Sequence, residues 1–149
     1  MRSYPPADPA LQDAVAQALA DLLATAPFVD FAFGHGSFFT SLPSHDIDVA
    51  LGLAVGAVAD LYALHDLASR CEGAVGRPVD VHVLGTPDSP LASTATTGRV
   101  LYARDADAAL AFAERAALMA WDFRWLQGEA VRDLAAAGRD RRARRAGSR

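Results

Sequence analysis

Two pairs of residues in the first third of the chain have the types and spacing to do chemistry together. Gly36 and Ser37 end one apolar run, and Asp46 and Asp48 stand at the head of the next. Alternate residues of an extended segment share a face, so the two aspartates are expected to point one way and Ile47 the other. Mg²⁺ binds through one or two carboxylates together with substrate phosphates. A glycine–serine turn offers phosphates backbone N–H groups, a hydroxyl and close approach.

A third carboxylate lies in a later apolar run, residues 79–84. The valines of this run share one face, and Asp80 and His82 share the other. If this strand lies beside the strand of Asp46 and Asp48, three carboxylates meet, which is electrostatically costly unless a cation binds there. Neither feature needs a metal to explain it. Asp80 could be a charge on a solvent-facing edge strand, and Asp46 and Asp48 could mark the solvated start of the earlier strand. For His82 we expect a structural or supporting role.

Apolar periodicity predicts helices and strands that alternate along the chain. Asp8 is expected to cap the first helix with Pro9 at its first position, and Ser89 or Asp88 to cap the third. Helices are predicted at 9–24, 57–71, 91–97 and 106–136, and strands at 28–33, 46–53, 79–84 and 99–102. The second helix is expected to bury Val58, Leu61, Leu64 and Leu67. This order indicates an α/β (α+β) fold with a small mixed sheet, helices on at least one face and a long C-terminal helix.

Composition and charge place the chain among globular proteins of one domain. Of its 149 residues, 52% are hydrophobic and 21% charged. Residues 1–8 are expected to be irregular, 9–137 to form the domain, and 138–149 to be a basic, disordered tail. The tail holds six arginines and one aspartate, so residues 1–137 carry −9 of a total net charge of −4. An acidic body argues against a nucleic-acid-binding domain, although the arginine-rich tail could contact RNA or an acidic partner.

The number of cysteines and the hydropathy of the sequence indicate the cellular compartment. Cys71 is the single cysteine, which excludes an internal disulfide and a cysteine-based zinc site. No apolar run approaches the roughly 20 residues of a membrane span, and the N-terminus lacks a signal-peptide core. We therefore expect a cytoplasmic protein with no membrane contact.

The spacing of these motifs resembles a known superfamily. Gly36-Ser37, Asp46-x-Asp48 and Asp80 on a later strand look like the signature of DNA polymerase β-like nucleotidyltransferases. Between about Leu11 and Ala136 the chain also resembles the minimal nucleotidyltransferases (MNT), known chiefly as antitoxins encoded beside HEPN-domain toxins. The segments that carry this second likeness are Arg77-Pro78-Val79-Asp80-Val81, Pro90-Leu91, Gly98-Arg99-Val100-Leu101-Tyr102-Ala103-Arg104-Asp105 and Trp121-Asp122-Phe123.

The resemblance implies a reaction and a partner. AMP would pass from ATP to a tyrosine hydroxyl of a HEPN ribonuclease toxin and silence it, within a hetero-oligomer. Asp46 and Asp48 would hold two Mg²⁺ ions, which clamp the attacking and leaving oxygens. Asp80 would complete the metal shell and help take the proton from the hydroxyl. Gly36 and Ser37 would hold the β- and γ-phosphates.

One departure from the family pattern keeps other functions open. Only eight residues, Phe38 to His45, separate the glycine–serine pair from the aspartates, and none is Arg or Lys. Family members commonly have a longer loop there, often with Arg and Gly, so a loop without a cation should bind triphosphate less well. A binding-only antitoxin with a weakened site is therefore one alternative. Transfer to a small molecule or to an RNA 3′ end is another. The aromatic residues of the final helix are where we expect a protein partner.

Overall fold

The computed structural model describes residues 1–40 and 42–147; residue 41 of the predicted loop and residues 148–149 of the predicted tail lie outside the described residues. Helices and strands alternate as the sequence predicts. The elements are α1 (Pro9–Leu23), β1 (Val29–His35), the 3₁₀ helix η1 (Ser37–Phe39), β2 (Ile47–Leu53), α2 (Leu61–Val75), β3 (Val79–Val83), α3 (Pro90–Ala95), β4 (Arg99–Ala103) and α4 (Ala106–Ala146).

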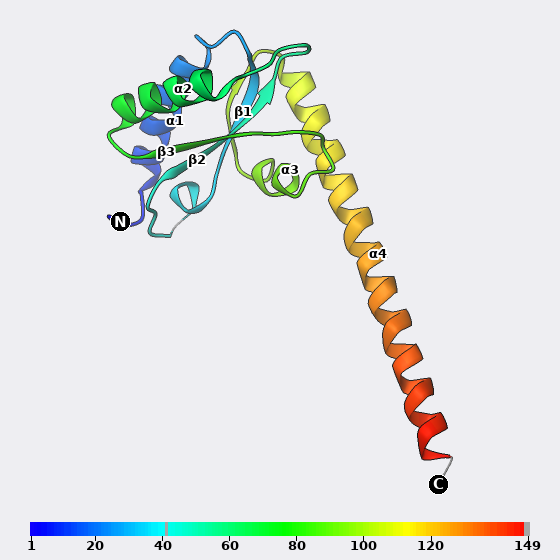
Figure 1. The fold of residues 1–149 in the computed structure, drawn as a ribbon. Helices are drawn as coiled ribbons and strands as arrows, with labels where there is room; N and C mark the ends of the chain where they lie inside the picture. Colours follow the sequence, from blue (N-terminus) through cyan, green and yellow to red (C-terminus); the bar gives the residue numbers. More distant parts are fainter. Residues whose placement is uncertain (41, 148–149) are drawn as a thin grey trace.

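The four strands form one mixed sheet in the order β3-β2-β1-β4 (Figure 1). β1 is antiparallel to both of its neighbours, and β2 and β3 are parallel. The α2 crossover between β2 and β3 is what makes a parallel pair possible. The predicted mixed sheet is therefore confirmed.

Helices cover both faces of the sheet. On one face α1 and α2 pack on the strands through a core that includes Leu19, Leu67 and Val49. On the other face α3 and the start of α4 pack on Phe31 and Phe33. Within β2 and β3 the residues that alternate with the first core, among them the site residues described below, point to the second face.

Local capping explains where the helices begin. The Asp8 carboxylate accepts a hydrogen bond from the N–H of Leu11 at 2.7 Å, with Pro9 at the first position. Ser89 caps α3, and Asp60 caps α2 through the N–H of Ala63 at 2.8 Å. Each cap satisfies an N–H group that has no partner within its helix. The caps at Asp8 and Ser89 confirm two predictions.

The predicted buried stripe of α2 is wrong at its start. The helix begins at Leu61 instead of near residue 57, and the side chains of Val58 and Leu61 are 89% and 84% exposed. Leu67 and Cys71 are buried, and Leu64 packs against them. The apolar periodicity extends one turn before the helix because Ala57 and Val58 are apolar without being helical.

α4 is longer than predicted and leaves the body (Figure 1). It runs to Ala146, although the sequence predicts an end near residue 136, so residues 138–146 of the expected disordered tail are helical. Alanine and arginine are strong helix formers, and a glycine costs only about 1 kcal/mol, so Gly128 and Gly138 do not stop the helix. The division of the chain at residue 137 stays a prediction.

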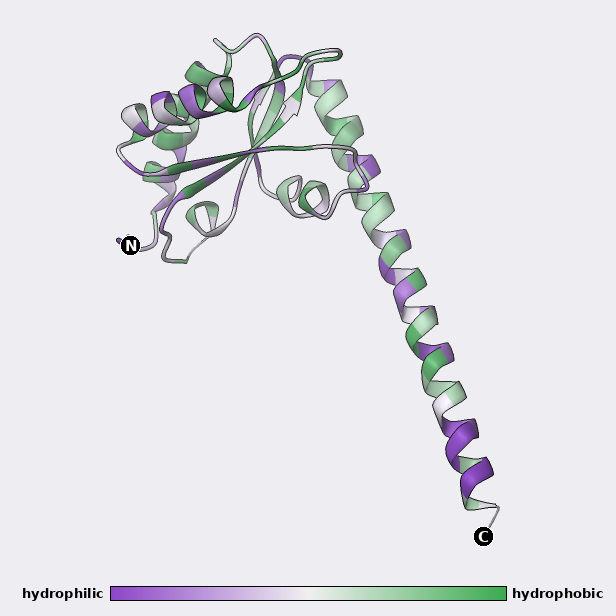
Figure 2. Cartoon of the chain, viewed as in Figure 1, coloured by the Kyte–Doolittle hydropathy of each residue, from purple (hydrophilic) through white to green (hydrophobic). Residues whose placement is uncertain are grey.

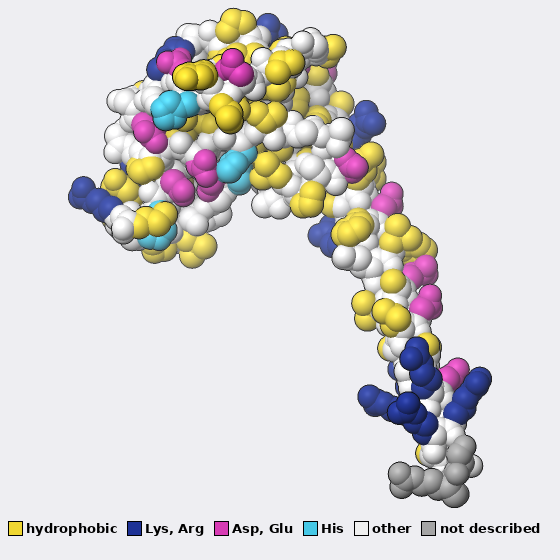
Figure 3. All heavy atoms as spheres, viewed as in Figure 1, with side chains coloured by type: hydrophobic (Ala, Val, Ile, Leu, Met, Phe, Trp, Pro, Cys, Tyr) yellow, Lys and Arg dark blue, Asp and Glu magenta, His cyan; other side chains and the backbone are white. Residues whose placement is uncertain are grey.

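Beyond the body α4 carries exposed apolar side chains (Figures 2 and 3). Ala116 is the last buried residue among those described in this helix. The exposed side chains include Leu118, Trp121, Phe123, Trp125, Leu126, Val131 and Leu134. Arginines gather near the far end of the helix (Figure 3). Across residues 1–40 and 42–147, no helix has the length and hydropathy needed to cross a bilayer.

Candidate active site

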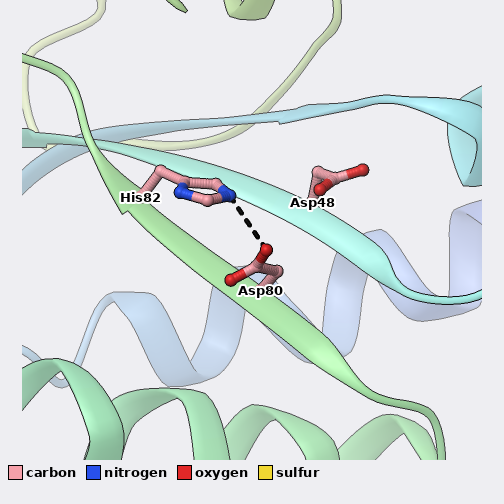
Figure 4. A group of neighbouring side chains, drawn as sticks. All are labelled: Asp48, Asp80 and His82. Carbon is pink, nitrogen blue, oxygen red and sulfur yellow. Dashed lines mark ion pairs between the residues drawn. The ribbon is translucent and has the colours of Figure 1, made fainter.

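The parallel pairing of β2 and β3 brings two of the predicted carboxylates together. Asp48 and Asp80 are register partners on the two strands. Their carboxylate oxygens and a ring nitrogen of His82 all lie within 4.8 Å of one another (Figure 4). We call these three residues the acidic cluster. The sequence places Asp80 and His82 on one face of their strand, and the register adds that this face meets Asp48.

His82 contacts Asp80 directly. Its Nε2 lies 3.1 Å from an Asp80 carboxylate oxygen, and both side chains are about half exposed (Figure 4). An imidazole this close to a carboxylate restricts the direction of that carboxylate. The supporting role expected for His82 fits this contact, and its nitrogen is also within reach of the same cation as the two carboxylates.

Asp46 lies at a bend one residue before β2 and is partly buried. Because it precedes the strand, the alternation of side chains that places Asp48 does not fix its direction. It is not part of the acidic cluster. It is close enough, however, for its charge to be the second cause, after burial, of the raised pKa of Asp48. Its predicted role as a metal ligand stays a prediction.

The turn at the end of β1 touches the acidic cluster. Gly36 has φ 76° and ψ −165°, a conformation open essentially to glycine alone. A Cβ atom on Gly36 would overlap a carboxylate oxygen of Asp48. Ser37 then begins η1, and the side chain of Phe38, the next residue of η1, is buried in the core. The glycine–serine turn is thus held against the predicted metal ligands, as a phosphate-binding turn needs to be.

Two contacts that the sequence did not reveal hold this turn and the loop after it. The Gln12 side chain, from α1, donates a hydrogen bond to the carbonyl of Phe38 at 3.0 Å. The guanidinium of Arg77 lies over the rings of Tyr4 and Phe38, at 4.3 and 5.3 Å from their centroids. Tyr4 in turn exchanges two backbone hydrogen bonds with Ser44. The short loop is thereby fixed at both ends.

His35 directly precedes the turn and lies beside the acidic cluster. It is the register partner of Asp48, and its ring centroid is 6.5 Å from that of His82. Its Nε2 is buried without a hydrogen-bond partner among the described residues. Burial lowers the pKa of His35, against the opposing effect of Asp48. His35 is thus a second imidazole beside the acidic cluster, with one ring nitrogen buried and unpaired among the described residues.

A cavity of about 550 Å³ opens beside the turn, on the β4 side of β1. Its volume is within the range of small-molecule sites. Arg99 lines it and was given no role by the sequence. The residues around it are Gln12, His35, Gly36, Ser37, Phe39, Thr40, Leu42, Thr94, Thr97, Gly98 and Arg99.

The electrostatics of the acidic cluster favour a divalent cation. Burial, then the charges of Asp46 and, more weakly, Asp80, raise the pKa of Asp48. Each of these causes opposes ionisation, and a bound cation would reverse that balance. Two carboxylates beside a glycine–serine turn are a donor set that Mg²⁺ can take up together with substrate phosphates. The residues present therefore fit the metal that the resemblance implies.

Comparisons with known proteins find likeness in structure. No family model matches the chain, and no curated sequence matches it. A tri-AMPylated Shewanella oneidensis HEPN toxin in complex with an MNT antitoxin matches at 21% identity and TM-score 0.59, over 83% of this chain and 98% of the matched one. A toxin–antitoxin complex with AMP-PNP matches at 18% and 0.61, over 80% and 98%. The toxin–antitoxin MntA–HepT matches at 18% and 0.59, over 83% and 99%.

The fold is of the nucleotidyltransferase type: a four-stranded mixed sheet with helices on both faces and carboxylates at the junction of two parallel strands. Within that class it is the fold of the MNT antitoxin complexes, over 80–83% of this chain. The fold prediction drawn from the sequence is confirmed. Identities of 18–21% establish the fold alone.

Proposed function

We propose that this chain is an MNT-type antitoxin that transfers AMP from ATP to a tyrosine hydroxyl of a cognate HEPN toxin. The observation that carries the proposal is the pairing of Asp48 with Asp80 beside the Gly36 turn. The structural neighbours support it, because their complexes contain an MNT antitoxin, an AMPylated HEPN toxin and, in one case, AMP-PNP.

The residues of the site have separate tasks in this reaction. Asp48 and Asp80, with Asp46 beside them, would hold two Mg²⁺ ions, which neutralise the triphosphate and activate the acceptor when bound. Gly36 and Ser37 bind the β- and γ-phosphates through backbone N–H groups and the hydroxyl. Electrostatic stabilisation and positioning carry most of the catalysis in phosphoryl-type transfer.

The bond changes are those of an in-line displacement. The acceptor oxygen forms a bond to the α-phosphorus, the bond from that phosphorus to the bridging oxygen breaks, and pyrophosphate leaves. The hydroxyl proton passes to Asp80, whose direction His82 fixes at 3.1 Å. Asp80 is exposed, so an acceptor side chain from a partner can reach it.

A binding-only antitoxin is the second candidate. The observation that favours it is the exposed apolar surface of α4, which can contact a partner whether or not the site transfers AMP. The loop from Phe38 to His45, which contains no arginine or lysine, points the same way. Transfer to small molecules or to RNA has no specific support in the described residues.

The test combines the purified chain with the HEPN protein encoded beside it, labelled ATP and Mg²⁺, and measures the intact mass of the partner. The expected result is a gain of one or more AMP units. Asp48→Asn and Asp80→Asn should abolish the gain, and so should Asp46→Ala. Asp66→Asn is the matched control, because Asp66 is an exposed aspartate on α2 that forms a surface ion pair with Arg70.

The outcomes separate the two candidates. A stable complex without a mass change would support the binding-only antitoxin. Transfer at wild-type levels by a folded Asp48→Asn protein would exclude the mechanism given above.

A further inference from the structure

The cavity beside the glycine–serine turn contains a cation that the loop itself lacks. Of the described residues that line the cavity, Arg99 is the one arginine or lysine. The loop from Phe38 to His45 has none. Arg77, the other arginine near the turn, stacks on Tyr4 and Phe38 and is not among the lining residues. Among the described residues that line the cavity, Arg99 is therefore the one with a permanently charged cationic side chain.

Strand pairing sets where Arg99 stands. It is the first residue of β4 and the register partner of Gly34, two residues before the turn at Gly36. Gly98 lets the strands meet here, because a Cβ atom on it would overlap the carbonyl oxygen of Gly34. The backbones of Asp48 and Arg99 thus lie on the strands to either side of β1, two strand spacings or about 10 Å apart. The Arg99 side chain points to the face that α1 covers and the Asp48 side chain to the opposite face, so a ligand that reaches both must cross the end of β1 at the Gly36 turn.

α1 fixes both the turn and the arginine. Gln12 binds the carbonyl of Phe38, and the next residue, Asp13, pairs with Arg99 at 2.6 Å. This ion pair is open to solvent, with 41% of the Arg99 side chain and 69% of the Asp13 side chain exposed. Exposed pairs contribute only about 0–1 kcal/mol, and a guanidinium has five N–H donors. Asp13 therefore orients the Arg99 guanidinium and leaves several of its N–H donors available for a ligand.

We propose that Arg99 binds the terminal phosphates of a nucleoside triphosphate. The α-phosphate of the same molecule would lie at the acidic cluster. The inference rests on the nucleotide binding of the proposed function and adds the residue that recognises the triphosphate. A polyphosphate over the Gly36 turn lies between the two strands that carry Asp48 and Arg99. Arginine suits this task because its planar fork can donate two parallel hydrogen bonds to a phosphate.

The experiment measures the affinity of the full chain for ATP, ADP and AMP by calorimetry, in the presence of Mg²⁺. Arg99→Gln should weaken ATP binding by about tenfold or more, which corresponds to about 1.4 kcal/mol, and AMP binding by less than about twofold. Arg99→Lys should lie between wild type and Arg99→Gln, because it keeps the charge and loses the fork. Arg70→Gln is the matched control, since Arg70 is also a surface arginine in an ion pair with an aspartate, away from the cavity.

Each outcome decides something. Equal ATP affinities for Arg99→Gln and wild type would overturn the inference, and so would an equal loss of ATP and AMP affinity, which would indicate a contact to ribose or base. A wild-type chain that binds no ATP would overturn both this inference and the proposed function. Loss of ATP affinity in Arg99→Gln, together with no AMP transfer to the toxin by wild type, would uphold the role of Arg99 and refute the transfer reaction. Far-UV circular dichroism and Tm check that the variants are folded.

Discussion

Replacing Gly36 by alanine tests the contact between the turn and the acidic cluster. Two separate features of the structure oppose the substitution. The backbone at Gly36 has φ 76° and ψ −165°, and the added methyl group would overlap a carboxylate oxygen of Asp48. The first effect strains the backbone, and the second displaces a predicted metal ligand.

The two effects have different sizes and different readouts. Holding a residue other than glycine in such a conformation costs about 1–3 kcal/mol. For a chain of this length that corresponds to a fall in Tm of about 3–10 °C. The overlap adds a loss of Mg²⁺-dependent ATP binding and AMP transfer, because Asp48 must turn away from Asp80 to make room.

Gly56→Ala provides the matched control. Gly56 has the same φ of 76°, and a Cβ atom there would meet nothing within 4 Å. Thermal unfolding, with and without Mg²⁺, would be measured for both variants. Gly56→Ala should lower Tm through the strain of its positive φ and keep the rise in Tm that Mg²⁺ produces, whereas Gly36→Ala should lose that rise.

The result that would refute the reasoning is a folded Gly36→Ala protein whose Mg²⁺ response and AMP transfer equal those of wild type. It would mean that Gly36 does not control the position of Asp48. Equal loss of the Mg²⁺ response in Gly56→Ala would attribute the effect to general destabilisation.

Three other predictions concern titration, thiol reactivity and fluorescence. Burial and neighbouring charges raise the pKa of Asp48, so its contribution to metal-free stability is complete below its unfolded pKa of about 3.8 and is lost as pH rises through the folded value. Tm measured from about pH 4 to about pH 7 should therefore show a stabilisation by Mg²⁺ that grows with pH, and none of this growth in Asp48→Asn. Burial raises the pKa of Cys71 to about 11, so the thiol should react with a disulfide reagent only after denaturation; rapid labelling of the native chain would contradict its burial. Trp121 and Trp125, the two tryptophans of the chain, are 62% and 51% exposed, so their emission should be that of hydrated indole and should move to shorter wavelength when a HEPN partner covers α4. Unchanged emission in a proven complex would locate the contact elsewhere.

Much of the fold follows from local patterns. Alternation and turn residues are enough to find β1 to β4, and a capping residue before a proline is enough to find the start of α1 and of α3. The end of α4 lies beyond the predicted residue 136 because the apolar pattern fades there, whereas the alanines and arginines that follow are strong helix formers. The stripe of α2 was misplaced because Val58 continues the periodicity outside the helix.

The candidate site divides in the same way. Alternation alone predicts that Asp80 and His82 share one face of β3. The pairing of Asp80 with Asp48 also requires β2 to lie beside β3, a condition that alternation does not establish. The place of Arg99 depends on two contacts between distant parts of the chain, the register with Gly34 and the ion pair with Asp13, which is 86 residues away in sequence. No periodicity encodes such contacts, and only the packing of α1 beside β4 brings them together.

The separation of α4 from the body has a consequence for the order of synthesis. The residues that build the site, from Gln12 to Arg99, all precede α4, and Ala116 is the last residue of the described helix that is buried. At translation rates of about 5–20 residues per second, residues 117–146 take about 2–6 s to be added. Small mixed α/β domains fold in milliseconds to seconds, so the folding of the body need not wait for the far part of α4. In a chain built in this way, the residues of the candidate site can come together before the far end of the last helix has left the ribosome.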